Sequence, residues 1–128
     1  MNIYMTDDFY DWRQSEEHIT DEMLIQAVKE VAQGLHNGAY KGGVYKKRIA
    51  NKTGQGSRGG SRMLTAYHAN KHTFIIEGFS KNVKVRHDSS EKKDFRDEAK
   101  YLFALNDEQI ETWCEKKLLF LLAEEVKV

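Results

Sequence analysis

The sequence predicts an α+β domain in which helices flank a small antiparallel sheet. Three observations support this prediction: an apolar stripe with helical spacing in the first third, short strand-like runs in the middle third, and two more helical stripes in the last third. The chain has 128 residues, 40% of them hydrophobic, which suits a single folded domain over residues 1–128. Because the strands lie between two groups of helices, we expect the helices to cover one face of the sheet.

The first third is predicted to be helical over residues 6–36. Thr20 is a suitable N-cap, and apolar residues then recur at spacings of three and four over residues 23–35. A shorter helix is expected over residues 8–14. Before it, residues 3–5 have the composition of a short strand.

The sheet is predicted over residues 43–82. Its strands are expected at residues 44–50, 63–68 and 73–80, where β-branched and aromatic residues gather. Between the first two strands, residues 51–61 hold four glycines and no apolar residue. This composition predicts a mobile loop.

The last third is predicted to be helical again, over residues 89–124. Asp88 with Glu91, and Asn106 with Gln109, have the spacing of a capping box, which marks the start of a helix. Apolar residues at helical spacing then mark two successive helices: Phe95, Ala99, Leu102, Phe103 and Leu105, followed by Ile110, Trp113, Cys114, Leu118, Leu121 and Leu122.

Several classes of protein are excluded by composition. No run approaches 18 apolar residues, so a transmembrane helix is not expected. Asp7 and Asp8 stand where a secretory signal would have a basic region before an apolar run. A single cysteine, Cys114, excludes a disulfide scaffold and fits the reducing cytosol. His68 and His72 have no carboxylate or thiolate at ligand spacing. We therefore expect a cytoplasmic protein without a membrane partner, metal or cofactor.

The charge of the chain is unevenly distributed, although the formal net charge is zero. Residues 1–36 hold eight acids and two bases, and residues 87–128 hold eleven acids and seven bases. Residues 37–86 hold eleven bases and one acid. The middle third is therefore the part that would attract a polyanion.

The most informative stretch is VYKKRI at residues 44–49. Alternate side chains of a strand share a face, so Lys46 and Arg48 point the same way and Lys47 points to the other face. Like charges on one face cost stability unless solvent or an anion lies against them. The stretch is therefore either a solvated edge strand, which its lysines protect from aggregation, or a surface that binds an anion.

The glycine-rich loop adds Arg58 and Arg62 to this basic region. Glycines let backbone N–H groups approach phosphate closely, and arginine forks grip phosphate oxygens. The loop lacks the lysine-serine ending of a P-loop, and its alternative interpretation is a hairpin loop without a ligand. Taken together, the excess of bases, the sheet and the loop indicate binding of RNA or DNA.

The residue types also limit how RNA would be cleaved. Residues 37–86 contain Glu77 as their single acid, whereas a metal-dependent nuclease needs a cluster of carboxylates. A metal-free route is therefore implied, in which the ribose 2′-hydroxyl attacks the adjacent phosphorus and cations stabilise the developing charge. His87 is either a general acid or base in this reaction or an ordinary loop histidine.

Three linked motifs carry a family resemblance. They are GGVYKKRIA at residues 42–50, GQG at 54–56 followed by GGSR at 59–62, and IEGFSKN at 76–82. Together they resemble the RelE/HigB-like toxins of bacterial type II toxin–antitoxin systems, over about residues 35–105. The same superfamily includes ParE-like toxins that poison gyrase, so the resemblance is less specific for activity than for fold.

The resemblance implies a compact α+β domain with a small curved antiparallel sheet flanked by N-terminal and C-terminal helices. It implies a metal-independent endoribonuclease that cleaves mRNA in the ribosomal A site. The expected partners are the ribosome, mRNA and a cognate antitoxin with a helix-turn-helix or other DNA-binding domain. Two rival functions stay open: a toxin that binds a protein such as gyrase without catalysis, and a plain RNA-binding module.

The resemblance also assigns residues. Lys46, Arg48 and Arg62 match the family's catalytic cations, with Arg62 on the scissile phosphate. We also expect Arg62 to be largely exposed in the free protein. His87 is the nearest substitute for the family's proton-transferring residue, because no tyrosine follows where relatives have one. The residues expected to bind RNA are Tyr45, Lys47, Arg58, Lys81, Lys84 and Arg86.

Overall fold

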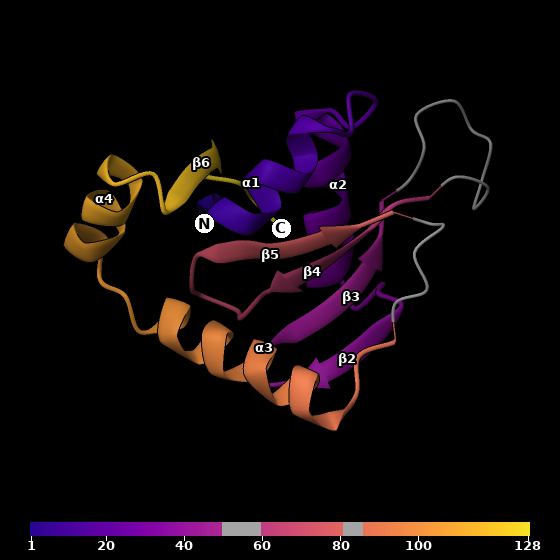
Figure 1. Cartoon of the computed structure of the whole chain (residues 1–128). Helices are drawn as coiled ribbons and strands as arrows, with labels where there is room; N and C mark the ends of the chain where they lie inside the picture. Colours follow the sequence, from indigo (N-terminus) through magenta and orange to yellow (C-terminus); the bar gives the residue numbers. More distant parts are fainter. Residues whose placement is uncertain (50–59, 81–85) are drawn as a thin grey trace.

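The computed structural model describes residues 1–49, 60–80 and 86–128 (Figure 1). Within them the chain forms, in order, β1 (Ile3–Thr6), α1 (Asp7–Gln14), α2 (Asp21–Ala32), β2 (Gly38–Lys41), β3 (Val44–Arg48), β4 (Arg62–Ala66), β5 (Thr73–Phe79), α3 (Ser89–Phe103), α4 (Asp107–Glu115) and β6 (Leu119–Ala123).

The strands form one six-stranded sheet in the order β2-β3-β4-β5-β1-β6. All neighbours are antiparallel except β1 and β5, which run parallel. The α+β class is therefore confirmed, and the sheet is mostly antiparallel. It is also wider than the predicted 43–82, because β2 pairs with β3 at one side, and β1 and then β6 extend it beyond β5 at the other.

Helices cover both faces of the sheet, so the prediction of helices on one face is wrong (Figure 1). Alternate residues of β4 explain the difference, because Met63 packs on one face and Leu64 on the other, and both are fully buried. Helices α1 and α2 cover the face of Met63, which we call the α1 face. Helices α3 and α4 cover the face of Leu64, which we call the α3 face.

The helix starts follow the predicted caps. The Thr20 hydroxyl accepts a hydrogen bond from the Met23 backbone N–H and starts α2. Both predicted capping boxes are present, at Asp88 for α3 and at Asn106 for α4. Each cap satisfies backbone donors that the first helical turn would otherwise leave unpaired. None of the described helices is long and apolar enough to cross a membrane.

Two strands differ from the predictions. Residues 119–123 form β6, where the sequence predicted that the helical region would continue to residue 124. Helix α4 ends at Glu115, Lys117 takes a positive φ of 59°, and the chain then pairs with β1. A short leucine-rich run fits either a helix or a strand by periodicity alone, and here the free edge of β1 decides. The second difference is β2, a short strand that starts with a glycine and lies before residue 43, where the sheet was predicted to begin.

Candidate functional site

Two rows of side chains run across β3, β4 and β5 at the end of the sheet where β5 finishes. Lys46 pairs with Leu64, and Leu64 pairs with Glu77. In the next row Arg48 pairs with Arg62. Residues directly opposite in a ladder share a face, and Leu64 marks this as the α3 face. Lys46, Arg48 and Arg62 therefore lie together, and we call these three residues the cationic patch.

Arg48 is held from several sides. Its backbone N–H donates to the Asn37 side-chain oxygen at 2.7 Å. A Cβ on Gly60 would lie 3.0 Å from the Arg48 Cγ, so the glycine allows the close approach of the two chains. The buried Nε–H of Arg48 has no acceptor among the described residues. A buried donor without a partner costs about 1–3 kcal/mol, and a phosphate oxygen is a suitable acceptor for a guanidinium.

Arg62 is half-buried, so the expectation that it is largely exposed is wrong. It opens β4 and is paired on both sides, with Arg48 on β3 and with Phe79 on β5. Just before it, the Ser61 carbonyl accepts a hydrogen bond from the Ile49 N–H at 2.8 Å. The backbone that carries Arg62 is therefore fixed by the sheet, which limits the movement of its guanidinium.

Lys47 and Tyr45 point to the α1 face, away from the cationic patch. The Lys47 ammonium lies 3.0 Å from a carboxylate oxygen of Glu30 on α2, and the Lys47 side chain is only 12% exposed. Partial burial opposes ionisation of Glu30, but hydrogen bonds from Lys47 and Gln26 hold the pKa of this carboxyl below its ordinary value. The Tyr45 ring packs 4.8 Å from the His36 ring. The structure therefore does not bring these two residues to the patch.

His87 is enclosed beside the patch, with its side chain 7% exposed. Its Nδ1 lies 2.5 Å from the Tyr40 hydroxyl, and its Nε2 lies 3.7 Å from a Glu77 carboxylate oxygen. The rings of Phe79 and Phe95 pack against the imidazole. Burial lowers the pKa of His87, as do the nearby ammonium groups, against the pull of neighbouring carboxylates. A neutral imidazole fits this arrangement when Tyr40 donates to Nδ1, with Nε2–H facing Glu77 at a distance longer than a direct hydrogen bond.

Glu77 reaches the α3 face through an irregularity in β5. Thr65 pairs with Ile75 and Leu64 pairs with Glu77, so Ile76 is an extra residue on β5. The Glu77 side chain is 40% exposed. Burial of its carboxyl, together with the negative charges of Asp8 and Glu91, raises its pKa. The site therefore places a partly exposed carboxylate on the same face as the cationic patch, with Leu64 between it and Lys46. Sequence reasoning missed this position, although Glu77 stood out as the single acid of its region.

Helix α3 contributes two further cations that sequence reasoning missed. The Lys92 ammonium lies 5.0 Å from the centre of the Tyr40 ring. One Arg96 nitrogen donates to the Tyr40 carbonyl at 3.1 Å. Both residues lie in the first part of the helix that the capping box predicts. Their spacing of four residues places them on one face of this helix, and this spacing could have identified them from the sequence. They fix the start of α3 against β2, at the border of the patch.

The remaining residues that were predicted to bind RNA lie outside the described part of the chain or at its border. Arg58, Lys81 and Lys84 are outside the described residues, as is most of the glycine-rich loop. Arg86 is described and exposed. The predicted site therefore meets in space through Lys46, Arg48, Arg62 and His87.

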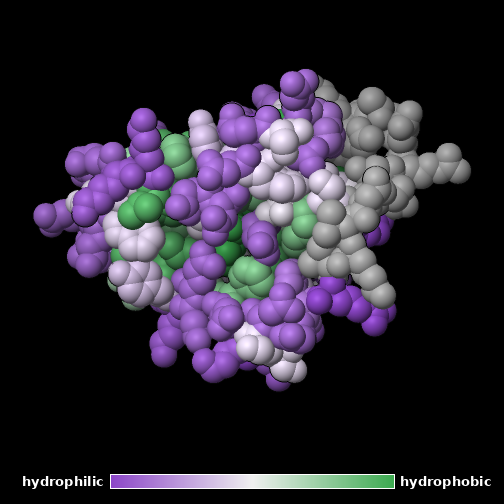
Figure 2. Space-filling view, in the orientation of Figure 1, coloured by the Kyte–Doolittle hydropathy of each residue, from purple (hydrophilic) through white to green (hydrophobic). Residues whose placement is uncertain are grey.

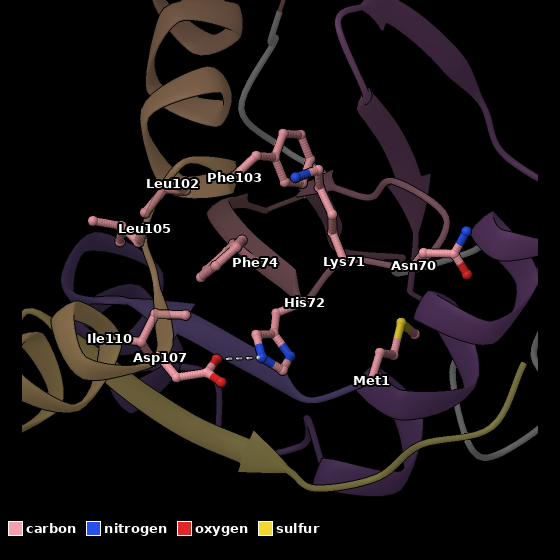
Figure 3. A pocket seen from close by; sticks show the side chains of 10 residues that line it. All are labelled: Met1, Asn70, Lys71, His72, Phe74, Leu102, Phe103, Leu105, Asp107 and Ile110. Carbon is pink, nitrogen blue, oxygen red and sulfur yellow. Dashed lines mark hydrogen bonds and ion pairs between the residues drawn. The ribbon is translucent and has the colours of Figure 1, made fainter.

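The two other predicted histidines lie at the opposite end of the sheet. A cavity of about 370 Å³ opens there between β5, α3 and α4, with Phe74 and Leu102 among its apolar lining residues (Figure 3). Figure 2 shows hydrophobic atoms gathered in this part of a mostly hydrophilic face. His72 Nδ1 accepts from the Asn2 N–H, and Nε2 lies 3.3 Å from Asp107. Within residues 1–49, 60–80 and 86–128, no cluster of three potential metal ligands occurs.

The chain was compared with known proteins and families. No curated protein matches the sequence. A family model described as the RelE toxin of the RelE/RelB toxin–antitoxin system matches residues 1–121, which is nearly the whole chain. This match agrees with the α+β fold and with the basic central strands. The chain therefore belongs to the RelE toxin family of toxin–antitoxin systems.

Proposed function

We propose that this toxin is a metal-independent, ribosome-dependent endoribonuclease that cleaves mRNA and inhibits translation. The observation that carries the proposal is the pairing of Arg48 with Arg62 across β3 and β4, with the buried Nε–H of Arg48 lacking an acceptor among the described residues. Two guanidinium groups on one face repel each other unless an anion lies between them. A phosphate of the RNA backbone supplies that charge and several acceptor oxygens.

In the proposed reaction, Arg48, Arg62 and Lys46 hold the scissile phosphate. The ribose 2′-hydroxyl oxygen attacks the adjacent phosphorus, and the bond from phosphorus to the 5′ oxygen breaks. The cleavage leaves a 2′,3′-cyclic phosphate and a free 5′-hydroxyl. The three cations stabilise the negative charge that builds on the phosphoryl oxygens, which is worth about 2.7–4 kcal/mol for one well-placed donor.

The proton transfer is assigned to the pair formed by Glu77 and His87. The partly exposed carboxylate of Glu77 accepts the proton of the 2′-hydroxyl, since its raised pKa makes it a stronger base than an ordinary carboxylate. The protonated Glu77 carboxyl then returns this proton, through water, to the leaving 5′ oxygen, which becomes the 5′-hydroxyl. His87 orients this carboxylate from the buried side, and Tyr40 in turn fixes the imidazole. Arg86 and the basic residues outside the described ranges (Arg58, Lys81 and Lys84) would contact the RNA backbone or the ribosomal RNA.

We propose further that a cognate antitoxin with a helix-turn-helix or other DNA-binding domain neutralises the toxin. Membership of a toxin–antitoxin family supports a partner of this kind. The ribosome would present the mRNA to the cationic patch.

The test is to induce the wild-type chain briefly in bacterial cells and to map the 5′ ends of abundant mRNAs by primer extension. We expect new cuts at fixed positions of the reading frame, and translation falling before DNA synthesis. The Lys46→Ala variant should produce no cuts. Lys71→Ala is the matched control, because Lys71 belongs to the same basic third but lies at the far end of the sheet, and it should cleave like the wild type. Intact mRNA together with induced DNA damage would contradict the proposal and favour a toxin that binds gyrase.

A further inference from the structure

Strand β6 forms one edge of the sheet, at the opposite side from β2 (Figure 1). Among the described residues its only strand partner is β1. Its sequence is LFLLA. Leu121 is 45% exposed, and Leu118, which precedes the strand, is 39% exposed. An apolar edge strand with unpaired backbone groups is a template for another strand, and proteins usually block it with a charge inside the strand or with a bulge on its outer side. β6 carries no charged residue, and its irregularity against β1 comes after Leu121, where Leu122 is an extra residue.

The charges beside β6 are arranged by sign. Lys116 and Lys117 come just before the strand, and Glu124 and Glu125 come just after it. All four side chains are exposed, and none forms an ion pair with a residue in the described ranges. The residues nearest to the strand therefore give it a basic end and an acidic end, while Glu115 and Lys127, which carry the opposite signs, lie further from it.

We propose that a second copy of this chain docks along β6 in the antiparallel direction and joins the two sheets into one. Antiparallel pairing brings the basic end of each copy to the acidic end of the other, whereas parallel pairing would bring like charges together. A partner identical to the strand itself is thus electrostatically complementary to it. The contact is the same on both copies, as a two-fold dimer requires.

The geometry limits where the two-fold axis passes. Residues 119–121 alternate regularly between the faces of the sheet, because the extra residue of β6, Leu122, comes after them. In an antiparallel ladder opposite residues share a face, so within this part the two positions that pair must both be even or both be odd. The centre of the charge pattern lies between residues 120 and 121. The axis therefore stands perpendicular to the sheet beside Phe120 or beside Leu121. In either case the exposed Leu121 is covered by a leucine of the other copy.

The dimer leaves the cationic patch accessible. The patch lies on β3 and β4, and β5 and β1 stand between it and β6. The two patches of a dimer would thus lie on opposite outer parts of the joined sheet. The inference does not depend on the proposed endoribonuclease activity, and its test measures no cleavage of RNA.

The experiment uses two charge-swapped forms of the full chain. The variant K116E/K117E has acidic groups at both ends of β6, and E124K/E125K has basic groups at both ends. Sedimentation equilibrium should give the mass of one chain, 14.9 kDa, for each variant alone. It should give twice that mass for the wild type, for the equimolar mixture of the two variants, and for the fourfold variant that exchanges both ends. Raising the salt concentration should weaken the mixed dimer, because its charges are exposed.

Folding is checked in parallel by circular dichroism, and every variant should keep the spectrum and the cooperative unfolding of the wild type, because the altered side chains are exposed. The monomeric variants should melt somewhat lower at high protein concentration, because the dimer stabilises the folded wild type by mass action. Leu121→Lys is a second route to the same result, since it places a charge at the centre of the contact, and it should be monomeric. A wild type that stays monomeric at all concentrations would overturn the proposal. So would a mixture of the two swapped variants that shows no association. If such a monomer loses affinity for its antitoxin when Leu121 is changed, the edge accepts a strand of the antitoxin and the proposed homodimer is wrong.

Discussion

Arg48 and Arg62 face each other across β3 and β4, on the face of the sheet that α3 covers. Arg48 reaches this place with its stem against Gly60, and Arg62 with its backbone paired on both sides. Two like charges in direct opposition destabilise a sheet. Their arrangement makes physical sense when an anion lies between them, and we interpret the pair as the phosphate-binding element of the toxin.

Removal of the Arg62 guanidinium should abolish most of the activity. We expect Arg62→Ala to slow mRNA cleavage by about 10²–10³-fold, because one preorganised donor is lost from the transition state. Arg62→Lys should recover only part of the rate, since an ammonium lacks the planar fork. Because Arg62 is half-buried, the free energy of unfolding should fall by about 1 kcal/mol, which leaves the protein folded. Full toxicity of Arg62→Ala in growing cells would refute the assignment.

Neighbouring lysines of β3 should separate activity from stability. Lys46→Ala should lose activity and keep its melting temperature, because Lys46 lies in the cationic patch. Lys47→Ala should keep most of the activity and lose about 1 kcal/mol of stability, because its ammonium is paired with Glu30 on α2. Urea unfolding and a growth assay measure the two effects. If Lys47→Ala is inactive and Lys46→Ala is active, the assignment of these two side chains to the faces of β3 is wrong.

Glu98 on α3 should make the protein less stable as the pH rises. Burial and the negative charges of Asp8 and Glu77 raise the pKa of Glu98 to about 7. The unfolded chain releases this proton near the ordinary value of 4.5, whereas the folded chain retains it. Its contribution to stability is therefore fully favourable only at low pH and is lost as the pH rises from about 4.5 through about 7.

The matching measurement is thermal unfolding of Glu98→Gln at several pH values. The variant should gain stability over the wild type at about pH 8 and show little difference at about pH 4. Glu108→Gln, at an exposed position of α4, serves as the control and should show no such trend. A pH-independent difference between Glu98→Gln and the wild type would contradict the assignment.

Chelation should not inactivate the toxin. The basic region contains a single acid, and the described ranges hold no cluster of metal-ligating side chains. Toxin treated with EDTA and then desalted should cleave mRNA on intact ribosomes as fast as untreated toxin. Loss of cleavage that is restored by adding a divalent ion to the toxin alone would show that the metal-free route is wrong.

The sequence was sufficient for the helix caps and for the basic strand, because these features depend on local spacing. The caps at Thr20, Asp88 and Asn106 bond as their spacing predicts. The α1 face of Lys47 also follows from strand alternation. Such patterns involve neighbours within four residues, so tertiary packing changes them little.

Other features depended on contacts between distant parts of the chain. Residues 119–123 become a strand because β1 offers an edge more than 100 residues away in sequence. Glu77 reaches the site through the extra residue in β5, which no spacing rule indicates. The half-burial of Arg62 and the enclosure of His87 arise from the packing of α3 on the sheet. These contacts join residues far apart in the sequence, so composition and periodicity could not predict them.

The most direct test of the account is a double-mutant cycle on Arg48 and Arg62, measured as single-turnover cleavage of mRNA on purified ribosomes. If both guanidinium groups hold the same phosphate, their effects are coupled, and Arg48→Ala/Arg62→Ala should be only slightly slower than the slower single variant. Primer extension should give identical cut sites in all variants that still cleave. Independent effects, in which the two losses multiply, would contradict a shared phosphate site, and undiminished cleavage by the double variant would contradict the cationic patch as the site of catalysis.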